Sequence, residues 1–278
     1  MTTAVAVDKA KEESNSSPDT KRTPSPQPST ERQINWWKIL LLPSVVEFTA
    51  TLIFVFVVTL SNLTTGDRSS NAPIINAAFG SGLIVMVLIY AVGPISGCHI
   101  NPAVTLGAFC SGLVAPGIVL AYIVAQLTGS VVGAALTRAV VSNESVLAAS
   151  RTYWPLGMYA SSISPAQALG LELLLTFILM LVILMTDVDH QSVMTPLAIG
   201  FVVVAEILAG GDKSGASMNP ARSFGPAIAF GVHEHLYVYF VGPVVGAVLA
   251  SLFHRFVLTK KKLPVPLLSS SVQLKTDR

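Results

Sequence analysis

The chain has 278 residues, of which 52% are hydrophobic and only 12% are charged, and its mean hydropathy is +0.65. A soluble globular domain carries about 25% charged residues, so this composition argues against one. The charges also gather at the ends, because residues 1–38 and 255–278 hold 12 of the 17 Lys and Arg side chains. Composition alone therefore predicts a lipid-embedded body with solvated tails.

The chain begins with a segment, residues 1–38, that is rich in Ser, Thr, Pro and charges of both signs. Such a segment has too little apolar surface to offset the entropy of ordering, so we expect a disordered cytoplasmic tail, and a second one at residues 259–278. No apolar stretch precedes residue 39, which predicts that the first span itself directs insertion. Two cysteines, Cys98 and Cys110, are too few for a disulfide framework.

Six apolar segments between the tails have the length of membrane spans, about 20 residues each for ~30 Å of hydrocarbon. They are residues 40–61, 74–95, 116–137, 166–186, 193–210 and 236–258. An even number of spans puts both termini on one side, and the basic residues Lys38, Arg255 and 260–262 predict that this side is cytoplasmic. The sequons at Asn62 and Asn143 then fall in outside loops.

Two further segments, residues 96–112 and 214–230, are too short to span and share the pattern Ser-Gly-x-x-x-Asn-Pro-Ala, 118 residues apart. The repeat extends upstream, where Glu47 and Glu172 are each followed four residues later by Thr. We interpret the body, residues 39–258, as a duplicated three-span unit with copies at 39–137 and 166–258. Because three is an odd number, the second copy must insert upside down, as in many transport proteins.

The repeated Asn-Pro-Ala predicts where two short helices start, because Asn is a preferred N-cap and Pro is favoured at the first helical position. Helices over residues 102–112 and 220–230 would each rise ~16 Å, so end to end they match the hydrocarbon core. Two re-entrant half-helices thus meet at the midplane, with both positive dipole ends repelling cations. Their Asn N–H groups and the loop carbonyls suit a narrow conduit for small neutral molecules.

On these residues the chain resembles the major intrinsic proteins, the aquaporins, over residues 36–258. The resemblance rests on both Asn-Pro-Ala motifs (Asn101, Pro102, Ala103 and Asn219, Pro220, Ala221), the following Arg222, and the paired Glu47 and Glu172. Residues 206–211, Glu-Ile-Leu-Ala-Gly-Gly, resemble the aqua-ammoniaporin branch, the aquaporin-eight type. The resemblance implies an all-α membrane protein with six transmembrane helices and two half-helices, assembled as a homotetramer with one pore per subunit.

The resemblance also implies a selectivity filter, with Arg222 as its arginine and the other positions at Ser81, Ile207 and Ala216. The position of Ser81 usually holds an aromatic residue or His, and many water-selective members carry His in place of Ile207, so we expect a wide constriction. Four other positions follow the water-channel pattern rather than that of glycerol channels, namely Ser223, Ala227, Tyr239 and Phe240.

Several further residues have two interpretations. Glu47 and Glu172 are either proton relays or structural acids that accept hydrogen bonds from the broken loops, and we favour the second because those loops need partners. Cys98 and His99 are expected beside the pore, where His99 either lines the wall or gates with pH. The sequence gives no role for Glu206.

We find no catalytic constellation, metal-ligand spacing or nucleic-acid-binding patch, and we expect no cofactor. The prediction is a passive channel in the lipid bilayer for water and small neutral solutes such as ammonia, urea or hydrogen peroxide. A glycerol-type facilitator, a secondary transporter and a poorly conducting junction protein remain as alternatives. We expect a multi-pass protein of the plasma membrane, with an intracellular membrane as the alternative.

Overall fold

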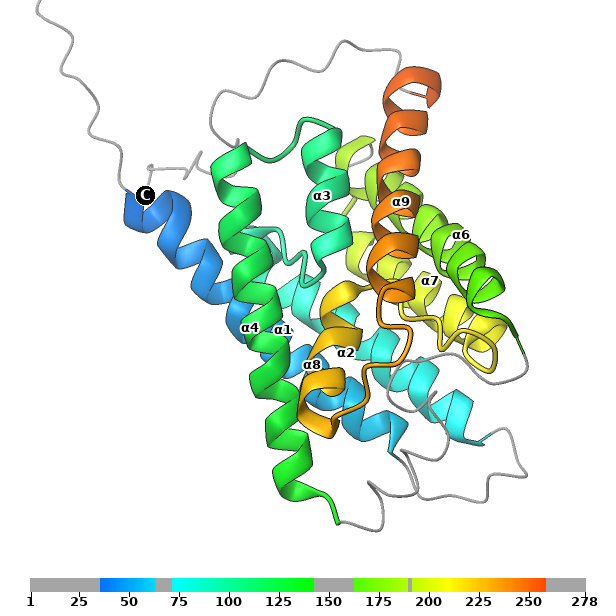
Figure 1. Cartoon of the computed structure of the whole chain (residues 1–278). Coiled ribbons are helices and arrows are strands. Elements are labelled where there is room, and N and C mark those ends of the chain that lie inside the picture. The colour runs from blue at the N-terminus through cyan, green and yellow to red at the C-terminus, as the bar shows by residue number, and fades with distance from the viewer. Residues whose placement is uncertain (1–35, 64–71, 143–162, 190–191, 259–278) are drawn as a thin grey trace, which may run out of the picture. The chain divides into compact units, whose positions relative to one another are not determined.

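A computed structural model describes residues 36–63, 72–142, 163–189 and 192–258 of the chain (Figure 1). Within these ranges all regular structure is helical, in the order α1 (Leu42–Asn62), α2 (Ala72–Ser96), α3 (Pro102–Cys110), α4 (Pro116–Val140), α6 (Pro165–Ile183), α7 (Thr195–Gly210), α8 (Pro220–Phe230) and α9 (Val238–Phe253). Three π-helical turns extend α1, α6 and α9: Trp37–Leu41, Leu184–Asp189 and His254–Leu258. The first of them begins two residues before the predicted start of the body. Most of both predicted tails, Asn143 and Lys260 lie outside the described residues.

All six predicted spans are helices. Five, counted with their π-helical extensions, are long and apolar enough to cross a membrane: Trp37–Asn62, Ile74–Ser96, Pro116–Val140, Pro165–Asp187 and Val238–Leu258. The remaining span, α7, is shorter than predicted, with 16 residues and a rise of ~24 Å. A turn takes the place of the first two residues of the predicted helix, 193 and 194. Thr195 N donates to Ser192 O (3.0 Å), and Pro196 then occupies the first helical turn, where its missing N–H costs nothing.

Close packing of glycines shows the inverted repeat directly. Gly82 on α2 and Gly200 on α7 lie 118 residues apart and face each other, so that a Cβ on either would come within 2.7 Å of the other's carbonyl oxygen. Residues that are equivalent in the two repeats therefore meet at the pseudo-twofold axis. Likewise Gly129 on α4 packs on Phe48 O of α1, and Gly246 on α9 packs on Leu173 O of α6.

The half-helices α3 and α8 lie in the upper and lower halves of the bundle in Figure 1. The prediction for α8 matches its observed bounds, whereas the prediction of a helix over residues 102–112 is wrong by two residues. The helix α3 ends at Cys110 because Gly112 adopts a left-handed conformation (φ 79°), and Leu113 N then bonds back to Ala108 O (2.9 Å).

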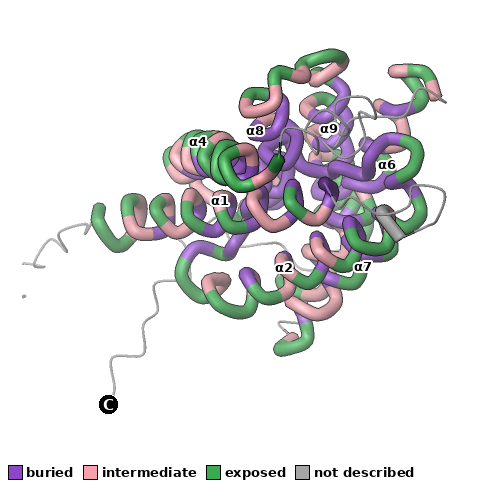
Figure 2. Tube along the Cα trace, turned by 90° about the horizontal axis from the view of Figure 1, so that it is seen from below, coloured by how far each residue is buried: buried purple, intermediate pink, exposed green. Residues whose placement is uncertain are grey.

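The outward sides of α1, α2 and α4 carry exposed residues, and the buried residues gather toward the middle of the bundle (Figure 2). Many of the exposed side chains are large and apolar, among them Val45, Val87, Tyr90, Leu120 and Phe256. Exposed apolar area of this extent on every long helix is a liability in water and fits a lipid solvent.

One predicted sequon disagrees with the structure. Asn62 is the last residue of α1 and is buried, so its side chain is not placed to carry a glycan.

Candidate functional site

The two asparagines of the repeated motif, Asn101 and Asn219, cap α3 and α8 and tie the two half-helices together. Their Oδ1 atoms accept from the backbone N–H groups of Ala103 (2.9 Å) and Ala221 (2.9 Å). Asn101 Nδ2 donates to Met218 O (2.8 Å), and Asn219 Nδ2 donates to Ile100 O (2.9 Å). Each amide therefore binds the residue that precedes the other asparagine, and it keeps a second N–H beyond that bond.

The chain before each asparagine is held in an unusual conformation. In the first loop, residues 96–101, Gly97, Cys98 and Ile100 have φ values of 87°, 49° and 44°, and in the second loop, residues 214–219, Gly215, Ala216 and Met218 have 87°, 41° and 54°. Left-handed backbone costs a non-glycine residue roughly 1–2 kcal/mol, so four strained positions need support from their surroundings.

Glu47 supplies that support for the first loop. Its Oε1 accepts from Ser96 Oγ (2.7 Å) and His99 N (2.9 Å), and its Oε2 accepts from Ile100 N (2.7 Å) and Gln126 Nε2 (2.9 Å). The carboxylate is fully buried and accepts from four donors, three in the first loop and one on α4.

Glu172 on α6 supports the second loop in the same way. Its Oε1 accepts from Ser214 Oγ (2.7 Å) and Ser217 N (2.9 Å), and its Oε2 accepts from Met218 N (2.7 Å). The two predicted acids thus hold equivalent loops, Glu47 with four donors and Glu172 with three.

A single cavity of about 500 Å³ runs along both loops. It is lined by every predicted filter and pore-adjacent residue and by both motif asparagines: Ser81, Cys98, His99, Asn101, Ile207, Ala216, Asn219 and Arg222. The remaining motif residues, Pro102, Ala103, Pro220 and Ala221, are buried in the first turns of the half-helices. The structure therefore brings together residues from α2, α7 and both loops that lie far apart in the sequence.

The filter residues combine two polar and two apolar side chains. Arg222 Nη1 donates to Gly215 O (3.3 Å), while Arg222 Nε and Ser81 Oγ have no hydrogen-bond partner among the described residues. Both groups are buried, and buried polar groups are normally paired. Because their residues line the cavity, these two groups are candidates for binding a molecule inside it.

Sequence reasoning did not predict which residues of α4 and α9 support the loops, although it named Tyr239 as part of the water-channel pattern. Tyr122 OH donates to Ser96 O (2.8 Å), and Tyr239 OH donates to Ser214 O (2.7 Å), so the two tyrosines play equivalent parts. A signal did exist, because the tyrosines lie 117 residues apart, nearly the offset of the motifs. No such signal marks Asp187, Ser192 and Val193, which also line the cavity.

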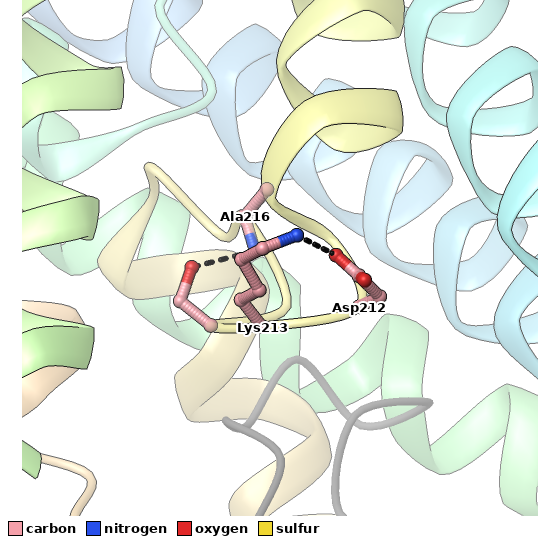
Figure 3. A network of polar contacts seen from close by, with 4 residues as sticks. Asp212, Lys213 and Ala216 are labelled. Atoms are coloured by element: carbon pink, nitrogen blue, oxygen red, sulfur yellow. Dashed lines mark hydrogen bonds and ion pairs between the residues drawn. The ribbon is translucent and has the colours of Figure 1, made fainter. Parts of the chain in front are cut away.

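A short polar turn leads into the second loop (Figure 3). Lys213 Nζ and Asp212 Oδ1 are 2.8 Å apart, with about half of each side chain exposed, and Ala216 N donates to Ser214 Oγ (3.1 Å). An exposed ion pair contributes ~1 kcal/mol or less, so the loop depends on its buried bonds rather than on this pair.

The sequence matches the family described as major intrinsic protein over residues 35–254. The chain belongs to this family. Among its curated relatives, aquaporin TIP1-2 of Zea mays is 41% identical over 220 residues, covering 76% of this chain and 84% of the relative. Aquaporin-8 of Mus musculus is 33% identical over 232 residues, covering 83% and 87%.

A solved structure of the family, the aquaglyceroporin from Plasmodium falciparum, superposes with a TM-score of 0.69 at 26% identity. The match covers 78% of this chain and 96% of that one. This major intrinsic protein is therefore a multi-pass membrane protein with the aquaporin fold, and it is a passive channel for water and small solutes.

Proposed function

We propose that this channel conducts water together with a neutral solute larger than water, ammonia first, through a filter formed by Ser81, Ile207, Ala216 and Arg222. The observation that carries the proposal is the pair of unpartnered polar groups, Ser81 Oγ and Arg222 Nε, at one cavity. The hydroxyl both donates and accepts, so it suits ammonia as well as water. A serine also leaves open the space that an aromatic ring would fill.

Exclusion of cations follows from two fixed positive features. The half-helices α3 and α8 begin at Asn101 and Asn219, which bond to each other's loops, so both positive dipole ends point at the same stretch of the cavity. Arg222 adds a full charge, and positive dipole ends and arginines repel protons and other cations from such pores. We assign Glu47 and Glu172 to holding this geometry rather than to moving protons.

We further propose that both termini are cytoplasmic, in the plasma membrane, and that four subunits assemble. Arg255, in the π-helical turn that follows α9, donates to the carbonyl oxygen of Cys110, the last residue of α3 (3.3 Å). The helix α3 therefore enters from the side that carries basic residues. Labelling of a cysteine at position 260 by an impermeant reagent outside intact cells would refute this orientation.

The filter is tested by Ser81→Phe in liposomes, with water and methylamine permeabilities measured by stopped flow. Because steric exclusion grows steeply with solute size, we expect methylamine flux to fall about tenfold and water flux about threefold or less. Thr128→Phe, on the exposed side of α4, is the matched control and should change neither.

Each alternative has its own outcome in the same liposomes. A wild-type channel that passes water alone, or fluxes that fall in proportion in Ser81→Phe, would refute the wide filter. Glycerol flux above that of methylamine would favour a glycerol facilitator, a candidate supported by the likeness to an aquaglyceroporin. Solute accumulation against a gradient would indicate a secondary transporter, and permeability equal to that of empty liposomes would indicate a junction protein.

A further inference from the structure

Glu206 on α7 is a buried acid outside the set of residues that line the cavity. Only 4% of the residue is exposed, and both carboxylate oxygens lack a hydrogen-bond partner among the described residues. It does not line the cavity, although its neighbour Ile207 does. An acid at membrane depth is expensive and points to a function, so the position needs an explanation.

The internal repeat shows that the fold itself does not require a polar residue at this position. The offset of 118 that pairs Gly82 with Gly200 also pairs Leu88 with Glu206. Leu88 is buried in the apolar core. The second repeat therefore carries a carboxyl group where the first is filled by a leucine.

The packing of α7 indicates what Glu206 faces. Val204 packs against Gly82 of α2, and a residue two positions later lies ~200° further around the helix, away from α2. One turn after Glu206, Gly210 faces Leu171 and Leu175 of α6 and also Ala216. Glu206 is therefore on the side of α7 that meets α6 and the second loop.

The charged groups on those elements are few. Glu172 is the one ionisable residue of α6, and its charge acts on Glu206. In the turn and α8, Asp212 and Lys213 are exposed and paired with each other, and Arg222 points to Gly215 O. The electrostatic partner of Glu206 is thus Glu172.

The two anchoring acids differ in one donor. Glu47 accepts a fourth hydrogen bond from Gln126 of α4, whereas Glu172 accepts three. The offset of 117 that pairs the tyrosines places Pro243 of α9 at the position of Gln126, and proline has no side-chain donor. Glu172 Oε2 therefore has an acceptor site that its counterpart has filled.

We propose that Glu206 holds a proton and donates it in a hydrogen bond to Glu172, as the substitute for Gln126 in the second repeat. A neutral Glu206 avoids two buried negative charges side by side, and a hydroxyl bound to a carboxylate forms a strong, charge-assisted bond. The bond closes by rotation of the Glu206 side chain or through one buried water. Glu206 is then a positioning residue for the loop that carries Ala216 and leads into Arg222.

The consequence is a filter that responds to alkaline pH. Loss of the Glu206 proton removes the donor and places a second negative charge beside Glu172, which loosens the bonds from Ser217 N and Met218 N. This response can be measured as a change in the ratio of methylamine to water permeability. That measurement rests on the proposed function, because it requires a channel that passes both solutes.

The test compares Glu206→Gln and Glu206→Leu with wild type in liposomes from about pH 6 to about pH 9. Glutamine donates at every pH, as Gln126 does to Glu47. With the methylamine permeability calculated for the uncharged amine, because most methylamine is protonated over this range, Glu206→Gln should keep the neutral-pH ratio throughout. We expect the wild-type ratio to shift about threefold or more on alkalinisation, since one charge-assisted bond biases a loop by at least that factor. Glu206→Leu should show the alkaline ratio at every pH.

Infrared spectroscopy supplies a second readout that needs neither solute flux nor a foldable leucine variant. Wild type should show the carbonyl band of a protonated carboxylic acid that disappears at alkaline pH and is absent from Glu206→Gln. A wild type without this band, or a Glu206→Leu channel with the pH profile of wild type, would overturn the proposal. If the channel passes water alone, the permeability ratio can no longer be measured, and the infrared band alone tests whether Glu206 holds a proton.

Discussion

The first and second loops share a backbone and differ in the side chains that meet the cavity. Both use Ser-Gly, Asn-Pro-Ala, a buried glutamate and a tyrosine to hold the same left-handed chain. The cavity, however, meets Cys98 and His99 in one loop and Ala216 and Ser217 in the other. Duplication thus accounts for the residues that build both loops, and we expect selectivity to come from the positions at which the copies differ.

The partners of these lining residues differ in the same way. His99 Nδ1 lies 3.1 Å from Thr105 Oγ1, and at the equivalent positions Ser217 Oγ lies 2.7 Å from Ser223 Oγ. The imidazole ring of His99 in the first half thus corresponds to the small hydroxyl of Ser217 in the second half. The half with smaller side chains is also the half with Arg222, so we expect charge rather than bulk to control passage there.

Removal of an anchoring acid, Glu47 in the first half or Glu172 in the second, should have the largest effect on stability. Glu47→Leu orphans four donors and Glu172→Leu three, at ~1–3 kcal/mol for each buried donor left unpaired. We expect both variants to lose the folded channel, as measured by thermal unfolding in detergent, and the proposed Glu206 hydroxyl, as a fourth donor to Glu172, should make the two losses similar. Thr128→Ala serves as the control, and a Glu47→Leu protein as stable as wild type would contradict the anchoring role.

Arg222→Val gives the second half the residue that the first half has at the equivalent position, Val104. Without the fixed charge, the half-helix dipoles alone oppose cations, and we expect proton leakage into liposomes to rise about tenfold or more. The measurement is decay of a pH gradient followed by an internal dye. Leakage at the wild-type rate would show that α3 and α8 suffice for exclusion.

The thiol that distinguishes the loops predicts the side from which mercurials act. Cys98 lines the cavity in the first loop where the second has Ala216, so we expect inhibition through Cys98 and faster from the cytoplasmic face. Cys98→Ser should abolish inhibition, and Cys98→Ser with Ala216→Cys should restore it from outside. Cys110→Ser is the control, and a Cys98→Ser channel that stays sensitive would disprove the assignment.

The smallest expected effect comes from removing the tyrosine hydroxyls, which tests whether the two loops are held equally strongly. Tyr122→Phe and Tyr239→Phe each remove one hydroxyl bond to a loop carbonyl and should lower the free energy of unfolding by ~1 kcal/mol. Equal values would mean that the two repeats contribute alike. A difference of several kcal/mol would show that one loop is held mainly by its tyrosine.

Local chemistry explains what the sequence predicted well. An Asn N-cap followed by Pro determines a helix start from neighbouring residues alone, so both half-helices and their meeting at the motifs could be predicted. The filter positions required the family resemblance, and the structure places them at one cavity.

The partners supplied by other helices could not be predicted. Gln126 reaches Glu47 across 79 residues, and no periodicity in α4 marks it as a donor. The end of α3 at Cys110 depends on Gly112 taking a left-handed turn, which its sequence allows and does not require. Nor does the sequence reveal that Glu206 faces α6 rather than the cavity.

The crossed bonds of Asn101 and Asn219 also constrain the order in which the protein can be built. The first repeat is synthesised before the second. Until the second loop exists, Asn101 Nδ2 lacks its acceptor, Met218 O, and Ile100 O lacks its donor, Asn219 Nδ2. The helix α3 also depends on the second repeat, because the carbonyl oxygen of Gly107 accepts a hydrogen bond from Ser251 Oγ (2.9 Å) on α9. The first half of the channel therefore cannot complete these hydrogen bonds until the last span, α9, has been synthesised.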